Sequence, residues 1–150
     1  MEYTLIANTL SVKDYIKLWE SVGWNNPPVE NQVEMGLKNS MVSVSVIHEN
    51  QVIGMGRVIG DGVIMCYIHD LIVMPEFQGR GIGKAIMENL IAYVKDNALP
   101  NTGITIGLLT ARGLEKFYGK FGFFIRSSDD RGPYMLMHIN KDGTIYKHSE

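Results

Sequence analysis

The most informative stretch of the sequence is residues 70–83, which read DLIVMPEFQGRGIG. An apolar segment ends at Val73, Pro75 marks a turn, and the glycine-rich run 78–83 leads directly into a pattern of helical periodicity. Backbone N–H groups at a helix N-terminus have no intrahelical partners and the dipole there is positive, so this position suits an anion such as a pyrophosphate. Glycine lets a ligand approach the backbone closely, and Arg80 adds a charged fork for phosphate oxygens. The stretch therefore predicts a phosphate-binding loop between a strand and a helix.

Two common phosphate loops do not fit this stretch. A P-loop needs a first Gly five residues before a second one, followed by Lys and then Ser or Thr. Here Gln78 stands at the first of these positions, and Ala85 follows Lys84. The dinucleotide fingerprint needs a third Gly where Lys84 stands. The pattern that remains is Gln-x-x-Gly-x-Gly after a strand and a proline turn.

A second block of sequence, residues 114–124, reads LEKFYGKFGFF. Together the two blocks resemble the GCN5-related N-acetyltransferases (GNAT). The acetyl-CoA loop of that family has the pattern seen at 78–83, and its late helix carries Phe-Tyr before a Gly-Phe that opens a strand. The resemblance covers about residues 3–139. One position departs from it, because Ala111 stands where the family commonly has an Asn seven residues before the tyrosine.

Hydrophobic periodicity and turn residues predict an alternation of strands and helices. Strands are expected at 3–6, 41–48, 51–59, 63–73, 104–109, from Phe123 and at 134–139, and helices from Ser11 and at 30–39, 81–96 and 111–120. Consecutive strands joined by short turns predict an antiparallel meander, whereas the later helices predict crossover connections. We therefore expect an α/β (α+β) fold with a mixed, mostly antiparallel central sheet and helices on both faces, which is the fold the resemblance implies. It should form a single domain over 1–140, followed by a polar tail over 141–150.

Composition narrows the classes of function. The 150 residues have the length of one domain, and a net charge of -2 without a long basic run argues against nucleic acid as a partner. No apolar run approaches the roughly 20 residues that span a membrane. Cys66 is the only cysteine and the first residues lack a signal-peptide pattern, so a cytoplasmic location is expected. His48, His138 and His148 do not have metal-ligand spacing, so no metal is expected.

The resemblance implies acetyl-CoA as cosubstrate and an amine as acceptor, with acetyl transfer by direct attack in a ternary complex. The residues it assigns to acetyl-CoA are the main chain at Ile72 and Val73, the loop residues Gln78, Gly79, Arg80, Gly81, Ile82 and Gly83, and Tyr118.

Tyr118 and Asp70 are the candidate catalytic residues. The resemblance places Tyr118 near the CoA sulfur, as a proton donor to the leaving thiolate. Members of the family often have an acidic residue at the position of Asp70, and the resemblance therefore implies that Asp70 is a base. Successive side chains of a strand point to opposite faces, so only one of His69 and Asp70 is expected to face the cleft. Histidine suits proton transfer near neutral pH, but His69 ranks second. Each candidate also has a structural alternative, Tyr118 as a packed core tyrosine and Asp70 as a satisfied buried acid.

Trp24, Tyr67 and Tyr134 are the aromatic candidates for the acceptor pocket, where a ring can stack on an aromatic amine or hold a cation. The predicted activity is N-acetylation of a primary amine on a small molecule. A protein N-terminus or a lysine is the alternative acceptor, and a non-catalytic acyl-CoA-binding regulatory module is the alternative function. The resemblance also allows a homodimer, which the sequence does not decide.

Overall fold

The computed structural model describes residues 1–126, 138–139 and 142–146. The chain forms two compact units, Met1–Leu109 and Thr110–Glu150. Most of the strand expected at 134–139 lies outside the described residues, as does Tyr134.

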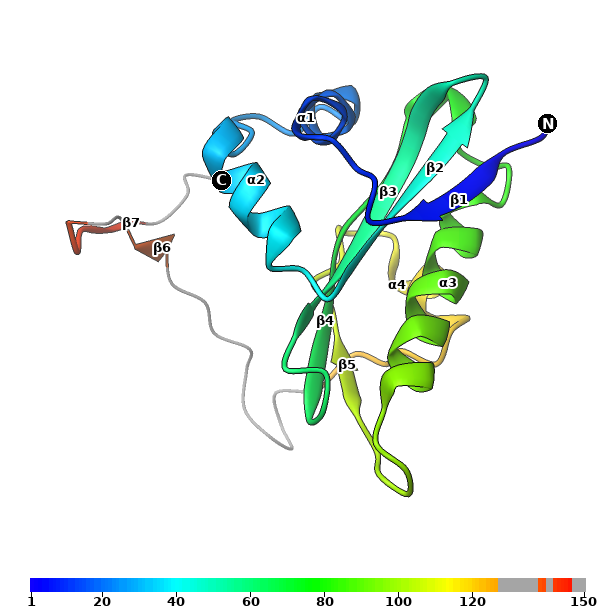
Figure 1. Ribbon diagram of the computed structural model, residues 1–150, viewed down its shortest axis with the longest axis vertical. Helices are drawn as coiled ribbons and strands as arrows, with labels where there is room; N and C mark the ends of the chain where they lie inside the picture. Colours follow the sequence, from blue (N-terminus) through cyan, green and yellow to red (C-terminus); the bar gives the residue numbers. More distant parts are fainter. Residues whose placement is uncertain (127–137, 140–141, 147–150) are drawn as a thin grey trace. The chain divides into compact units, whose positions relative to one another are not determined.

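The first unit is built on a five-stranded sheet whose strands follow the order of the sequence (Figure 1). The strands are β1 (Thr4–Ala7), β2 (Val42–His48), β3 (Gln51–Gly60), β4 (Met65–Val73) and β5 (Thr105–Gly107). β1 to β4 pair antiparallel, and β5 joins β4 in parallel. The predicted meander and the mixed, mostly antiparallel sheet are therefore confirmed.

Two of the predicted strands exceed the observed ones by two residues or more. Residues 63 and 64 belong to the β3–β4 turn, because Asp61 Oδ1 accepts the N–H groups of Val63, Ile64 and Met65. β5 is only three residues long, against the six expected at 104–109.

Helices cover both faces of this sheet. α1 (Val12–Ser21) and α2 (Glu30–Lys38) lie on one side, and α3 (Ile82–Asn97) lies on the other (Figure 1). α1 begins where its sequence predicts, because the Ser11 side chain accepts the N–H of Asp14 at 3.0 Å as an N-cap.

The packing of α3 depends on small residues in β3. A Cβ placed at Gly56 would lie 2.8 Å from Ile86 Cγ2 and 2.9 Å from Leu90 Cδ1. Ile82, Ile86 and Leu90, which belong to the predicted apolar face of α3, are buried against the sheet. Each such side chain contributes roughly 1.5–3 kcal/mol when it leaves water. The start of α3 is thus held firmly against the sheet.

A β-bulge interrupts β4 near its middle. Arg57 pairs with His69 and Met55 pairs with Ile72, so two residues of β4 stand opposite a single residue of β3. The first of these two is Asp70, whose φ is +54°. The bulge therefore shifts the facing of side chains along β4 by one residue.

The two sides of the bulge show this shift directly. Leu71 points to the α3 face, since its Cδ1 would lie 3.6 Å from a Cβ at Gly56. The carboxylate of Asp70 lies on the α1–α2 face, together with Arg57 and the ring of His69. The expectation that His69 and Asp70 face opposite sides of the sheet is wrong, because strand alternation does not hold across a bulge.

The second unit contains α4 (Glu115–Gly119), which is shorter than the helix expected at 111–120. Gly113 has a φ of +89°, which lies outside the helical region and delays the helix start. Residues 123–126 are not a strand, contrary to the expectation of a strand from Phe123. Further on, β6 (His138–Ile139) pairs antiparallel with β7 (Ile145–Tyr146), so part of the predicted polar tail forms a hairpin.

Candidate functional site: a glycine loop and a buried polar cluster

The glycine-rich loop connects β4 to α3. A 3-10 turn, Pro75–Phe77, follows the strand, and Gly81 is the N-cap of α3 with a φ of +82°. The first intrahelical bond is donated by the Ala85 N–H to the Gly81 carbonyl at 3.0 Å, so the amides of the first helical turn have no helical acceptor. A Cβ placed at Gly79 or Gly81 meets no atom within 4 Å. The loop therefore presents backbone donors to open space, as an anion site requires.

The side chains of this loop have distinct surroundings. Gln78 Nε2 donates to the Val73 carbonyl at 2.9 Å, which ties the loop back to β4. The Arg80 guanidinium lies 5.7 Å from the centre of the Phe77 ring and is exposed. Ile82 is buried in the core, so only its main chain is available to a ligand. Arg80 is thus the charged side chain of the loop, and it is exposed.

Asp70 lies in a buried polar cluster on the α1–α2 face of the sheet. Its Oδ2 accepts a hydrogen bond from the Tyr15 hydroxyl at 2.7 Å and another from Arg57 Nε at 2.6 Å. Its Oδ1 lies 2.5 Å from His69 Nδ1, an ion-pair distance without the alignment of a hydrogen bond. The Asp70 side chain is 1% exposed and that of His69 is 42% exposed. The cluster therefore has a buried acid at its centre and a histidine at its solvent side.

The charges of this cluster are balanced. Burial alone would raise the pKa of the Asp70 carboxyl, but His69, Arg57 and the Tyr15 hydroxyl together hold it below its ordinary value. Burial, and then the Asp70 charge, raise the pKa of Tyr15, which keeps its hydroxyl protonated as a donor. Asp70 is consequently ionised at neutral pH, with Arg57 as its counter-charge.

The sequence did not single out Arg57 and Tyr15 as members of this cluster. Arg57 Nη1 also donates to the Gly36 carbonyl at 3.4 Å and to Ser40 Oγ at 3.3 Å, which joins the cluster to α2 and the residues after it. A lone charge within the apolar strand 51–60 is the signal that points to Arg57. Tyr15 was recognisable only as part of an apolar helix stripe, although a buried tyrosine hydroxyl usually has a partner.

Aromatic rings lie in a row beside the cluster. Tyr15 stacks on Trp19 with ring centres 6.0 Å apart, and Trp19 meets the edge of Trp24 at 4.9 Å. Tyr67 lies 5.9 Å from the ring of His69. Of the three predicted acceptor residues, Trp24 is thus linked through Trp19 to the cluster and Tyr67 lies next to its histidine.

Tyr118 belongs to the second compact unit. Within that unit its ring meets the edges of Phe117 at 5.0 Å and Phe123 at 6.2 Å. Burial raises the pKa of the Tyr118 hydroxyl. The hydroxyl is therefore protonated over the neutral pH range, as a proton donor must be.

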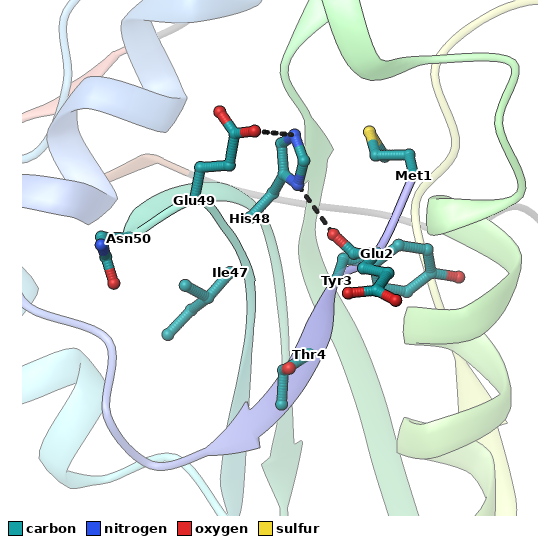
Figure 2. Close-up of a pocket in the computed structure, with 8 residues that line it drawn as sticks. All are labelled: Met1, Glu2, Tyr3, Thr4, Ile47, His48, Glu49 and Asn50. Carbon is teal, nitrogen blue, oxygen red and sulfur yellow. Dashed lines mark hydrogen bonds and ion pairs between the residues drawn. The ribbon is translucent and has the colours of Figure 1, made fainter.

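A separate hollow lies at the β1 edge of the sheet, and Figure 2 shows the eight residues that line it. His48 is at its centre, with Nδ1 2.7 Å from the Glu2 carbonyl and Nε2 4.0 Å from Glu49 Oε1. The His48 ring also meets the edge of Phe77, 5.7 Å away, at the start of the glycine loop. None of the residues predicted for catalysis or for the acceptor lines this hollow.

The described part of the chain has no cluster of three or more His, Cys, Asp or Glu side chains that could hold a metal ion. Among the same residues, no helix is both long and apolar enough to cross a membrane.

Comparison with known proteins identifies the family. Residues 9–123 match the acetyltransferase (GNAT) family. An uncharacterized N-acetyltransferase, ycf52, from Porphyra purpurea is 32% identical over 124 residues, which cover 79% of this chain and 68% of that protein. The histone acetyltransferase TAP1 of Glycine max is 30% identical over 126 residues, and this chain spans about half of it (52%).

A solved structure shows the same relationship. The crystal structure of a probable acetyltransferase from meticillin-resistant Staphylococcus aureus superposes with a TM-score of 0.79 at 30% identity, covering 90% of this chain and 99% of that one. The chain belongs to the GNAT family and is an enzyme of the acyltransferase class. The predicted resemblance and the predicted fold are confirmed.

Proposed function

We propose that this enzyme transfers the acetyl group of acetyl-CoA to the primary amine of a small molecule, by direct attack within a ternary complex. The observation that supports it most is the arrangement of one strand. β4 ends in the glycine loop at the start of α3 and carries the His69–Asp70 pair at its middle. A candidate anion site and a candidate proton-transfer site therefore lie along the same strand.

The spacing along β4 suits a bound acyl-CoA. From Val73 to His69 is four residues, roughly 13 Å of extended chain. With the pyrophosphate on the first turn of α3 and Arg80, a pantetheine arm paired with the main chain at Ile72 and Val73 runs toward the bulge. The thioester then arrives beside the half-exposed His69 ring.

The acceptor chemistry requires a proton acceptor at that place. An alkylamine with a pKa of about 10.4 is neutral in about one molecule in 2,500 at pH 7, so the bound ammonium must lose a proton before it attacks. The His69–Asp70 pair supplies an imidazole next to an ionised carboxylate.

The aromatic row favours a small acceptor with an apolar or aromatic part. The rings of Trp24, Trp19 and Tyr15 run from the surface to the hydroxyl that bonds Asp70. Aromatic faces bind apolar groups and organic cations well. A protein N-terminus or lysine is the second candidate acceptor, because the Glycine max relative is named a histone acetyltransferase. The sequence also predicts, as an alternative function, a regulatory module that only binds acyl-CoA. It further predicts a cytoplasmic location.

Thiol release tests the activity. Purified protein with acetyl-CoA is assayed against arylalkylamines, polyamines, amino sugars, amino acids and peptides with free N-termini or lysines. Release with a small amine supports the proposal, and release with peptides alone supports the second acceptor. No release, with acetyl-CoA still raising the melting temperature, would support the regulatory module.

Tyr118→Phe tests the proposed proton donor. We expect kcat to fall about 100-fold, the lower range for loss of a general acid, with the affinity for acetyl-CoA unchanged in calorimetry. Tyr93→Phe is the matched control, since the Tyr93 hydroxyl donates to the half-buried Met41 carbonyl at 3.0 Å. Turnover equal to that of the control would return Tyr118 to a packing role.

A further inference from the structure

We infer that His69, and not Asp70, takes the proton from the acceptor amine, and that Asp70 is a positioning residue that orients the His69 ring. The inference rests on the proposed acetyl transfer and concerns which atom of the site serves as the base.

Asp70 is poorly placed to reach a substrate. A general base must lie within hydrogen-bond reach of the proton it removes, directly or through one water. The Asp70 side chain is 1% exposed, its Oδ2 already accepts two hydrogen bonds, and its Oδ1 faces the His69 ring. Both carboxylate oxygens are thus engaged inside the protein.

His69 has the complementary placement. Its side chain is 42% exposed, and Nδ1 is the nitrogen turned toward Asp70. An ionised carboxylate at Nδ1 favours the tautomer with the proton on that nitrogen, as in Ser-His-Asp triads, and it stabilises the imidazolium that forms. The lone pair of the imidazole is then on Nε2, on the other side of the ring.

The bulge makes this pairing possible. In a regular strand the two consecutive side chains would lie on opposite faces. At the bulge, Asp70 has a φ of +54° and its carboxylate stays on the face of its predecessor. A left-handed conformation at a residue other than glycine is costly, and such strain concentrates at functional sites.

The proton balance of the step closes. Nε2 of His69 takes one proton from the bound ammonium, and the neutral amine attacks the thioester carbon to form the N–C bond. The C–S bond breaks with its electron pair on sulfur. The nitrogen loses a second proton as the amide forms and the thiolate gains one proton, so these two transfers cancel. The products are the amide, the free thiol of CoA and protonated His69.

Titratable and charged groups on three elements surround His69. Asp70 and Tyr67 face it from β4, Arg57 is its partner on β3, and Tyr15 reaches it from α1 through Asp70. The described residues of β5, Thr105–Gly107, have no titratable side chain. Histidine is the side chain in this set that ordinarily titrates between pH 5 and 8.

The test compares the pH dependence of kcat/KM in His69→Asn and Asp70→Asn, with one amine that the wild type accepts. The asparagine amide at position 69 replaces Nδ1 beside Asp70 but leaves nothing in the place of Nε2. We expect at least a 100-fold loss of kcat/KM and loss of the acidic limb of the profile, with acetyl-CoA affinity unchanged. Dividing by the wild-type value at each pH cancels the titration of the amine itself.

Asp70→Asn should behave differently. The acidic limb should remain and move to lower pH, because the imidazolium loses its neighbouring carboxylate. Histidine C2–H titration by NMR should show the same displacement for His69 without any need for turnover. His48→Asn is the matched control, since His48 lines the hollow at β1, and it should leave rate and limb unchanged.

The outcomes separate cleanly. If the acidic limb of the kcat/KM profile is lost in Asp70→Asn and kept in His69→Asn, the inference is overturned and Asp70 is the base. If both variants keep the acidic limb, the inference is overturned as well. If Asp70→Asn does not fold, His69→Asn and its control decide alone. Failure of the wild type to acetylate any amine would instead count against the proposed function.

Discussion

The glycine loop and the cluster around Asp70 lie at the end and the middle of the same strand, yet they are built in opposite ways. The loop consists of consecutive residues that present main-chain N–H groups to open space. The cluster consists of a buried acid and of partners that lie 55 and 13 positions from it in the sequence, at Tyr15 and Arg57. A site of the first kind needs only local conformation, whereas one of the second kind exists only when α1, β3 and β4 have come together. The two should therefore respond differently to mutation.

Removing the counter-charge of the cluster should have the largest effect on stability. In Arg57→Gln the buried Asp70 carboxylate loses its cationic partner, and breaking such a pair costs about 3 kcal/mol. We expect the free energy of unfolding in urea to fall by that amount, while the folded protein still binds acetyl-CoA. Lys84→Gln is the control, because the exposed Lys84–Glu88 pair at 2.9 Å should not contribute measurably. An Arg57 variant as stable as the control would mean that the cluster does not hold the sheet to α1 and α2.

Filling the glycine loop should do the reverse, with a large effect on binding and a small one on stability. Gly81→Asn and Gly81→Asp share a similar shape and tolerate a positive φ at a cost of about 1 kcal/mol. Each puts a side chain where the phosphate should approach, and Asp adds a like charge. We expect acetyl-CoA affinity in calorimetry to fall about 10-fold for Asn and about 100-fold for Asp, since charge-assisted contacts to phosphate are strong.

Gly23→Asp is the control for this pair. Gly23 has a φ of +73° with no atom within 4 Å of an added Cβ, so it carries the same backbone strain away from the loop. It should lower stability slightly and leave acetyl-CoA affinity unchanged. Equal affinity in Gly81→Asp and Gly81→Asn would show that no phosphate lies at the N-terminus of α3.

The smallest expected effect is a pH dependence of stability that belongs to the cluster alone. The pKa of Asp70 is lower in the folded protein than its ordinary 3.8, so its ionised form stabilises the fold fully above that pH. As the pH falls below 3.8 this contribution is lost. The difference in unfolding free energy between wild type and Asp70→Asn should narrow as the pH falls from 4 to 3. A difference that stays constant down to pH 3 would mean that the ionised carboxylate does not stabilise the fold.

The free energy of unfolding at acidic pH also distinguishes the glycine loop from the cluster around Asp70. The glycine loop contains no carboxylate between Gln78 and Gly83, so Gly81→Asn should keep a constant stability difference from wild type over the same pH range. The comparison of Gly81→Asn with Asp70→Asn thus separates a main-chain site from a charged side-chain site.

Local sequence patterns determined most of the fold and the loop. The proline turn and the glycines at 75–83 specify their own conformation, because the interactions involved span only a few residues. Ser11 sets the start of α1 for the same reason, and the apolar spacing over 81–96 sets the buried face of α3. These features, and membership of the GNAT family, were therefore predictable from the sequence.

Only the tertiary structure decided how the middle of β4 is used. The bulge at Asp70 arises from the pairing of β3 with β4, which no local pattern encodes, and it reverses the rule by which His69 and Asp70 would face apart. Arg57 and Tyr15 become partners of one carboxylate only when distant segments pack around it. The sequence shows which residue types can transfer a proton. Burial and contacts in the folded protein determine which of these residues can reach the proton of a bound substrate.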